Sequence, residues 1–305
     1  MITKTAKNQG ERNVLTMAAI TNSDMLKELD NGNRFIGTAP QMNNSKIVFN
    51  GEENVLICED GVNLVNSSIT FNGNDSVVYL SKNRHNYILS VSANGENVFY
   101  MGKNNYMNGV LNVILSERKH CLIGDNCLLS FGIWIRNADP HLIFDCESNQ
   151  RINPSKSIFI GDHVWVGQSA MILKGTKIDS GSIIGAMSLV AGKNIPSNES
   201  WGGNPCKQIA KNIFWEDSCV HKWDRNMTQL SKNFVKYSKK KNLTISAFKF
   251  EYDNSQTVSY EDIDCIFSEK SVDKKIEFMT ELSSGNAKNR FVHSNEKSFK
   301  KRLFR

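Results

Sequence analysis

The 305-residue sequence lacks any apolar run long enough to cross a membrane. No stretch approaches the roughly 18 consecutive apolar residues that a transmembrane helix needs. The first residues, MITKTAKNQGERN, also lack the apolar core of a secretory signal peptide. We therefore expect a cytoplasmic protein.

Paired cysteines and a strong charge of one sign are missing as well. Seven cysteines are scattered along the chain without any Cys-X-X-Cys pair or Cys/His ligand spacing. Reduced thiols are therefore expected, rather than disulfides or a zinc site. The net charge of +6 is modest for this length. It favours anionic ligands only weakly and does not indicate a nucleic-acid partner.

What the sequence does contain is a strict period of six between residues 160 and 190. Every sixth residue is a β-branched aliphatic, namely Ile160, Val166, Ile172, Ile178, Ile184 and Val190. The residues four positions further on are small or β-branched, namely Val164, Ala170, Thr176, Ser182 and Ser188. A period of six fits neither a helix nor a simple alternating strand. It is typical of an all-β solenoid whose three-sided coils stack about 4.8 Å apart, with the aliphatic residues inside.

Glycines directly follow three of the aliphatic positions, at Gly161, Gly167 and Gly185. At a coil corner, glycine tolerates backbone angles that other residues avoid. The glycines therefore predict strained corners at these points.

The six-residue register extends back to Ile123 and Ile135, then breaks and resumes at Ile160. Equivalent positions on successive coils should be 18 residues apart, whereas Ile123 and Ile160 are 37 apart. About 19 residues are therefore inserted between neighbouring coils, as a loop over residues 136–157. Excursions from a regular scaffold usually carry function.

A looser repeat occupies residues 46–119. Asn-Gly pairs recur every 22 residues, at positions 50, 72 and 94, and each precedes a β-rich run. Asn-Gly is a strong turn signal, so a hairpin meander would also give this pattern. The constant period favours irregular, wider coils of the same solenoid. In the N-terminal segment 1–45, the only clear element is a short helix with Ser23 as its N-cap.

The chain changes character after the hexads. Residues 209–215 are expected to fold back and cap the open end of the solenoid. In the extension 216–305, the residue pattern predicts a basic helix over 224–241, strands at 243–245 and 248–250, and a helix over 272–282. The basic cluster at 297–305 is interpreted as a solvated or partly disordered tail. The alternative is a site that docks on an acidic polymer, a partner or a membrane surface. The chain thus divides into segments 1–45, 46–119, 120–215 and 216–305.

Several motifs carry a family resemblance over residues 120–215. They are Ile160-Gly161-Asp162-His163-Val164-Trp165-Val166-Gly167, Ile172-Leu173-Lys174-Gly175, Ile184-Gly185-Ala186 and Gly203-Asn204-Pro205. Together they resemble the hexapeptide-repeat acyltransferases, which fold as a left-handed parallel β-helix. The Asp139-Pro140-His141 loop is similar to that of O-acetyltransferases of surface and capsular polysaccharides, including polysialic acid. The resemblance implies acetyl-coenzyme A as donor, a saccharide acceptor, no metal, and a homotrimer with active sites in the grooves between prisms.

Such a transfer needs a base that takes the proton of a sugar hydroxyl, and histidine suits this role near neutral pH. His141 is our first candidate, because it lies on the inserted loop and matches the essential histidine of the family. Asp139 is expected to hold one of its ring nitrogens. His163 is the second candidate, whereas His120 has no identifiable partner. By the pattern of the family Trp165 is functional, although trimer packing is the competing interpretation.

For the donor, the resemblance implies an extended arm along a solenoid edge. The small residues Gly185, Ala186 and Ser188 allow close approach there. Cationic partners for the phosphates are expected among Lys193, Lys207 and Lys211. Asn204 and Pro205 match the loop of the family at the coenzyme end, and Cys206 stands where that loop usually has alanine.

Three other functions remain open. The acceptor can be the amine of an amino-sugar nucleotide. A zinc hydratase of the γ-carbonic anhydrase type shares the prism, but His120, His141 and His163 lack the close His-X₄-His pair that its metal site uses. A non-catalytic scaffold is the third alternative.

Overall fold

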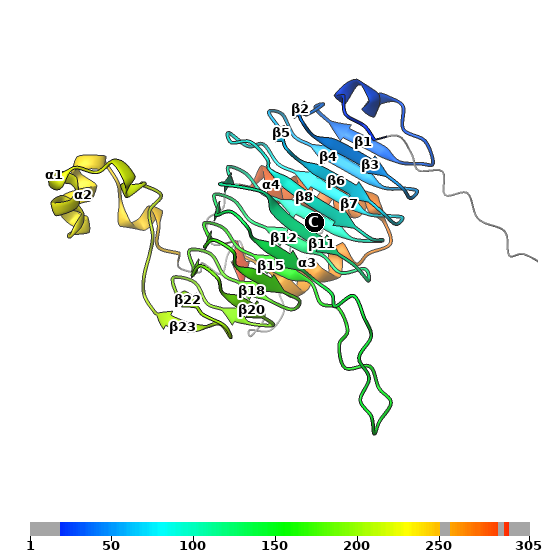
Figure 1. Ribbon diagram of the computed structural model, residues 1–305. Helices are drawn as coiled ribbons and strands as arrows, with labels where there is room; N and C mark the ends of the chain where they lie inside the picture. The colour runs from blue at the N-terminus through cyan, green and yellow to red at the C-terminus, as the bar shows by residue number, and fades with distance from the viewer. Residues whose placement is uncertain (1–18, 251–256, 286–289, 293–305) are drawn as a thin grey trace, which may run out of the picture.

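The chain forms a parallel β-solenoid of about seven turns, as the hexad pattern predicts. A computed structural model describes residues 19–250, 257–285 and 290–292. Three sheets form the sides of a prism, and a few helices from the C-terminal region lie outside it (Figure 1). Every strand pair within the prism is parallel except the last, in which β23 runs antiparallel to β22.

The strands of each side follow one another up the prism axis. The eight-stranded sheet contains β1 (Arg34–Gly37), β4 (Val55–Cys58), β7 (Val77–Leu80), β9 (Val98–Met101), β12 (Cys121–Ile123), β15 (Ile158–Ile160), β18 (Lys177–Ile178) and β21 (Asn194–Ile195). The seven-stranded sheet contains β3 (Lys46–Phe49), β6 (Ser68–Phe71), β8 (Leu89–Ala93), β11 (Leu111–Leu115), β14 (Trp134–Arg136), β17 (Met171–Leu173) and β20 (Leu189–Ala191). The six-stranded sheet contains β10 (Tyr106–Met107), β13 (Leu128–Leu129), β16 (Trp165–Val166), β19 (Ile183–Ile184), β22 (Ser200–Gly202) and β23 (Lys207–Ala210). A short parallel pair, β2 (Gln41–Asn43) and β5 (Asn63–Val65), stands apart from these three sheets.

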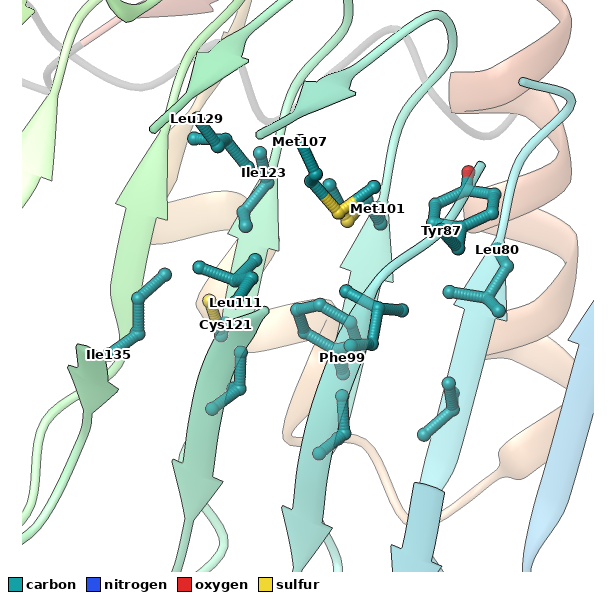
Figure 2. Close-up of a cluster of buried hydrophobic side chains, with 14 of the residues drawn as sticks. Leu80, Tyr87, Phe99, Met101, Met107, Leu111, Cys121, Ile123, Leu129 and Ile135 are labelled. Atoms are coloured by element: carbon teal, nitrogen blue, oxygen red, sulfur yellow. The ribbon is translucent and has the colours of Figure 1, made fainter. Parts of the chain in front are cut away.

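The interior of the prism is filled by the residues that the hexad register selects. All six aliphatic positions from Ile160 to Val190 are fully buried, and so are the small residues four positions later. Figure 2 shows the same arrangement further up the prism, where Ile123, Leu129 and Ile135 point inward beside Met101 and Met107. The period of six therefore arises because one residue on each side of each coil faces the core.

The corner glycines Gly161 and Gly167 are required because the next coil lies close to them, and not because of their backbone angles. Gly161 and Gly167 do not adopt the left-handed backbone conformation. A Cβ atom on Gly161 would lie 2.7 Å from the Ser180 hydroxyl oxygen, and one on Gly167 would lie 2.5 Å from the Ala186 backbone nitrogen. The next coil passes too close for any side chain. Gly185 does not adopt that conformation either, so the prediction of strained corners is wrong at all three glycines; close stacking explains Gly161 and Gly167.

The 22-residue repeats are coils of the same solenoid. Strands β3, β6 and β8 pair in parallel with a shift of 22 residues, so the hairpin alternative is wrong. The repeated asparagines stack: the side-chain amide of Asn50 donates to the Asn72 oxygen at 3.2 Å, and Asn72 donates to Asn94 at 3.0 Å. At the turns, a Cβ on Gly51 would lie 2.3 Å from the Gly73 carbonyl oxygen.

The N-terminal end of the prism is covered by a short 3₁₀ helix, η1 (Ser23–Lys27). Its N-cap is Asn22 rather than Ser23, since the Asn22 side-chain oxygen accepts a hydrogen bond from the Asp24 backbone nitrogen at 3.1 Å. Leu26 is buried against the core of the prism.

The middle strands of the eight-stranded sheet, from β4 to β15, are buried on both faces, which was not predicted from the sequence. Its outward side chains, including Val55, Ile57, Tyr79 and Tyr100, pack against α3 (Tyr260–Phe267) and α4 (Val272–Ser284). The Tyr260 ring stacks on Phe159 at 5.3 Å. The expected helix over 272–282 is thus present as α4. A small parallel pair, β24 (Val258–Ser259) and β25 (Phe291–Val292), lies beside α3.

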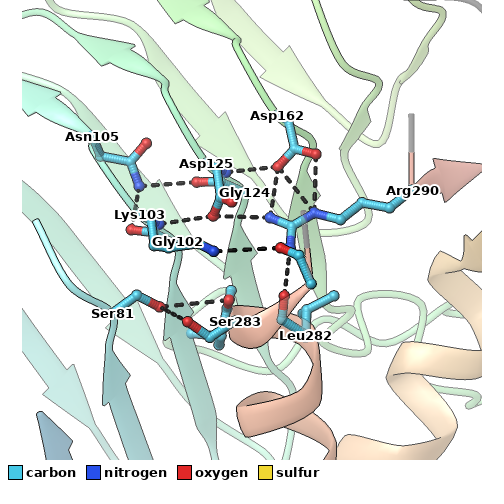
Figure 3. Close-up of polar contacts among 12 residues, drawn as sticks. Ser81, Gly102, Lys103, Asn105, Gly124, Asp125, Asp162, Leu282, Ser283 and Arg290 are labelled. Atoms are coloured by element: carbon cyan, nitrogen blue, oxygen red, sulfur yellow. Dashed lines mark hydrogen bonds and ion pairs between the residues drawn. The ribbon is translucent and has the colours of Figure 1, made fainter. Parts of the chain in front are cut away.

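A buried ion cluster fastens this helical cover to the prism (Figure 3). Arg290 donates to both carboxylate oxygens of Asp162, at 2.8 Å from Nη2 and 3.0 Å from Nε. Its Nη2 also lies 2.9 Å from a carboxylate oxygen of Asp125, and its Nη1 donates to the Leu282 carbonyl oxygen at 2.6 Å. The guanidinium therefore joins the C-terminal region to two successive coils.

The segment between the prism and this cover folds as a small helical unit. It contains η2 (Val220–Lys222), α1 (Arg225–Ser231), α2 (Phe234–Lys241) and η3 (Ile245–Ala247). The predicted single basic helix is broken at Asn233, whose side chain caps α2. The strands predicted at 243–245 and 248–250 are wrong, because this stretch turns helically: Thr244 and Ile245 accept backbone hydrogen bonds from residues three and four positions further on. The basic cluster at 297–305 lies outside the described residues.

No helix among the described residues is long and apolar enough to span a bilayer. The seven cysteines are all free thiols, four of them buried.

Candidate active site

The insert between β14 and β15 forms an arm that leaves the regular coils (green, Figure 1). Its outgoing and returning segments run antiparallel, with an isolated bridge between Phe144 and Arg151 and a hydrogen bond from the Ile152 nitrogen to the Ile143 carbonyl oxygen at 2.9 Å. Leu142, Ile143, Phe144 and Ile152 are each at least half exposed. A cluster of apolar side chains on a projecting arm is typical of a surface that packs against another molecule.

His141 lies near the base of this arm and is exposed. The Asn153 side-chain amide fixes its backbone, donating to the His141 carbonyl oxygen at 2.8 Å and to a carboxylate oxygen of Asp139 at 3.1 Å. The imidazole is thus held in place through the main chain, with its ring open to solvent. This arrangement suits a base that meets a substrate from outside the chain.

Asp139 has a different partner from the expected one. Its carboxylate forms an ion pair with Lys174, which also donates to the Asn153 carbonyl oxygen at 3.0 Å. The hydrogen bond from Lys174 lowers the pKa of Asp139. A full cationic charge competes better for the carboxylate than a neutral imidazole does. In the described chain Asp139 therefore orients the arm, and the expected bond to the His141 ring is not formed.

A second ion pair ties the arm to the preceding coil. Arg151 binds Glu117 through two parallel hydrogen bonds of 2.7 and 2.9 Å, and the Ser155 hydroxyl donates to the same carboxylate. The hydrogen bonds from Arg151 and Ser155 lower the pKa of Glu117 from 4.5 to about 2. A lowered pKa means that this contribution to the stability of the arm is complete above pH 4.5 and disappears as the pH falls towards 2.

Replacing Glu117 with glutamine should loosen the arm without unfolding the prism. We expect thermolysin at neutral pH to cut beside Leu142, Ile143 or Phe144 several-fold faster in the variant than in the parent chain. Glu52→Gln, which changes an exposed carboxylate on another coil, is the matched control. Equal cleavage rates in Glu117→Gln and the parent would show that this ion pair does not hold the arm.

Trp165 lies on a different side of the prism from the arm. It points outward from β16 in the six-stranded sheet with 39% of its surface exposed. The arm instead leaves the corner between the seven-stranded and eight-stranded sheets, because it joins β14 to β15. Within one chain the structure therefore does not bring His141 and Trp165 together.

The other two candidate histidines are committed to packing. His163 stacks flat on Trp215 with ring centroids 3.9 Å apart, and the Trp215 indole nitrogen donates to the His163 carbonyl oxygen at 3.0 Å. His120 is fully buried, and its Nδ1 accepts from the Val98 backbone nitrogen at 3.1 Å. Burial, helped by the charges of Lys275 and Lys119, lowers the pKa of His120 to about 3. His120 is therefore a neutral structural residue, and the described residues hold no metal-binding cluster.

Most of the candidate donor residues gather at the corner between the six-stranded and seven-stranded sheets. The Gly185 nitrogen donates to the Trp201 carbonyl oxygen, and the Leu189 nitrogen donates to the Gly203 carbonyl oxygen, so the Asn204–Pro205 turn stacks beside Gly185. Ala186 is exposed, and a Cβ on Gly185 would meet nothing within 3.4 Å. The Ala186 side chain is therefore the part of this edge that is open to solvent.

Ser188 and the three candidate lysines do not lie together on this edge. Ser188 is buried, and its hydroxyl donates to the Gly185 carbonyl oxygen at 2.7 Å, so it braces the turn from inside. Lys207 begins β23 beside the turn, whereas Lys211 follows the far end of that strand. Lys193 follows β20 at a different corner of the prism. All three lysines are exposed, but they do not form one cluster in the described chain.

The residues that position the arm could not be recognised from the sequence. Lys174 belongs to a repeat motif, and Asn153 and Arg151 belong to no sequence pattern. Their role depends on contacts between residues 12 to 35 positions apart. The one available signal was the presence of Lys174 on the coil that follows the insert.

Comparisons with known proteins agree with this architecture. The family model described as bacterial transferase hexapeptide (six repeats) matches residues 157–192. Polysialic acid O-acetyltransferase of Escherichia coli O1:K1 / APEC is 34% identical over 102 residues, 33% of each chain. The enzyme of the same name from Neisseria meningitidis is 30% identical over 109 residues, 36% of this chain and 51% of the relative. The chain thus spans between a third and a half of the length of these curated relatives.

The structural similarity covers more of the chain than the sequence similarity does. The crystal structure of the polySia-specific acetyltransferase NeuO aligns with a TM-score of 0.56 at 30% identity, over 70% of this chain and 95% of that one. The alignment covers nearly all of the solved structure, and the hexapeptide model falls on the regular coils. The chain therefore belongs to the hexapeptide-repeat transferase family.

Proposed function

We propose that this protein transfers an acetyl group from acetyl-coenzyme A to a hydroxyl of a bacterial surface or capsular saccharide. The observation that carries the proposal is the exposed His141 on a projecting arm whose base two ion pairs fix to the neighbouring coils. The names of the related enzymes support a polysaccharide acceptor. The exposed Ala186, close to the exposed Lys207 at the start of β23, suits a donor that carries phosphate groups.

In this mechanism His141 takes the proton of the attacking sugar hydroxyl as the C–O bond to the acetyl carbonyl forms. The carbonyl oxygen carries negative charge until the C–S bond breaks. His141 then returns its proton to the sulfur, which leaves as the free thiol. The transfer is direct, without an acyl-enzyme. Trp165 supplies an apolar face beside the reacting groups.

The separation of His141 and Trp165 within one chain leads us to propose that the site is shared between chains of a homotrimer. The apolar end of the arm, at Leu142, Ile143 and Phe144, is available to pack against a neighbouring prism. One chain would then supply the base and the next chain Trp165 with the donor edge.

A complementation experiment tests the shared site. Chains carrying His141→Ala and chains carrying Trp165→Ala should each be nearly inactive, whereas mixed trimers contain interfaces with both native residues. Co-expression should therefore restore a substantial fraction of the parent activity. If the mixture stays as inactive as its components, each site lies within one chain and the proposed sharing is wrong.

The function itself is tested by incubating the full chain with acetyl-coenzyme A and a panel of saccharides. Free thiol should appear only with an active acceptor, and the product should be an alkali-labile ester. An alkali-stable product would identify an amide and an N-acetyltransferase. Failure of acetyl-coenzyme A to raise the thermal unfolding temperature would contradict a donor site and favour a scaffold.

A further inference from the structure

The six-stranded sheet carries a stripe of apolar side chains on its outer face. Tyr106, Leu128, Trp165 and Ile183 are matched in register across β10, β13, β16 and β19. Tyr106 is 44% exposed and Trp165 is 39% exposed. Two strand spacings separate them, which amounts to about 10 Å along the prism. The stripe therefore continues from the candidate site towards the 22-residue coils.

Tyr106, at the end of this stripe, contacts His85 of the preceding coil, and His85 in turn holds its neighbour Arg84. The His85 ring meets the Tyr106 ring edge-on, with centroids 5.1 Å apart. The Nε atom of Arg84 donates to Nε2 of His85 at 3.2 Å. The Arg84 side chain is exposed, and no carboxylate among the described residues forms an ion pair with it. Its two terminal amino groups are thus open to a ligand.

The imidazole of His85 is suited to hold this arginine. Partial burial and the charge of Arg84 lower the pKa of His85, while Asp217 acts in the opposite direction. A neutral ring keeps Nε2 as a hydrogen-bond acceptor for Arg84. The guanidinium is therefore oriented before any ligand arrives, and less side-chain freedom is lost when one binds.

We propose that Arg84, His85 and Tyr106 form a subsite that binds an anionic sugar unit of a polymeric acceptor. Arg84 would pair with the carboxylate of that unit through two parallel hydrogen bonds. The exposed face of Tyr106 would stack on the apolar side of the ring. The subsite lies about 10 Å from Trp165 along the prism, so a long polymer reaches both points and a short acceptor does not. This inference rests on the proposed function, because it assumes that the acceptor lies beside Trp165.

The test measures binding without acetyl-coenzyme A, so that it does not depend on catalysis. The probes are long-chain polysialic acid, its dimer, and neutral dextran. Tyr106→Ala and Arg84→Gln should each weaken binding of the long anionic polymer about 3- to 10-fold. Neither change should affect the dimer. Lys46→Gln is the matched control, since it removes one exposed positive charge from the seven-stranded sheet.

The outcomes separate this inference from the proposed function. Unchanged polymer binding in both variants, or equal binding of polysialic acid and dextran by the parent chain, would overturn the subsite. Dissociation of the oligomer in Tyr106→Ala would assign the stripe to a contact between chains and would also overturn it. A parent chain that binds the polymer in the predicted way but releases no thiol with any acceptor would overturn the acetyltransferase and leave the subsite standing.

Discussion

Replacing His141 with alanine should lower kcat at least about 10²-fold, since general-base catalysis contributes rate factors of about 10² to 10⁴. The thermal unfolding profile should not change, because the His141 side chain is exposed and only its main chain is anchored. The measurement is thiol release at saturating acetyl-coenzyme A and acceptor. The affinity for the donor should stay close to that of the parent, because the imidazole acts on the hydroxyl proton.

His221→Ala is the matched control, as it removes another exposed histidine, from η2. The control should retain full activity. A His141→Ala chain with near-normal turnover would remove this residue from the mechanism. A chain that loses activity together with its oligomeric state would instead indicate that the arm acts in assembly.

Replacing Arg290 with alanine should release the helical cover from the prism. The substitution leaves the carboxylates of Asp162 and Asp125 buried without their cation. Breaking a buried ion pair in this way typically costs about 3–5 kcal/mol. Limited trypsin digestion should then free a fragment containing α3 and α4, and the denaturation midpoint should fall. Lys274→Ala removes the exposed ion pair with Glu269 and is the control, expected to change stability by less than about 1 kcal/mol.

The loss of stability in the Arg290→Ala variant should become smaller as the pH falls. Burial already raises the pKa of Asp125 in the native chain, against the opposing charge of Arg290. Without Arg290 the native-state pKa rises further above its unfolded value, so protonation stabilises the folded variant. The stability difference between parent and variant should therefore shrink as the pH falls from 7 to 5. A difference that is small at pH 7, or that grows on acidification, would contradict a fastening role for Arg290.

The regular coils could be predicted from sequence because their determinants are local and repeated. Every inward position from Ile160 to Val190 is a buried β-branched aliphatic residue, so the period of six reveals the coils. The same register locates the insert, and with it the exposed position of His141. The partner of Asp139 could not be predicted, because Lys174 reaches it only once the arm has folded across the next coil.

The helical cover left a signal in the sequence that the analysis did not use. The strands Val55–Cys58, Val77–Leu80 and Val98–Met101 are apolar at every position, and all of their residues are buried. A strand with only one face in the core alternates apolar with polar residues, as β8 does. The sequence of these strands does not show which segment covers their second face, because the covering helices begin some 160 residues further along the chain.

That cover has a consequence for how the protein is made. The outward faces of β4, β7 and β9 emerge from the ribosome long before α3 and α4 are synthesised. At ~5–20 residues per second, the roughly 160 residues between Tyr100 and Tyr260 take on the order of 8 to 32 s. During that interval the nascent solenoid presents a broad apolar face with nothing to pack on it. Helices α3 and α4 thus protect the outward faces of β4, β7 and β9. A translation product that stops before these helices is expected to aggregate or recruit a chaperone.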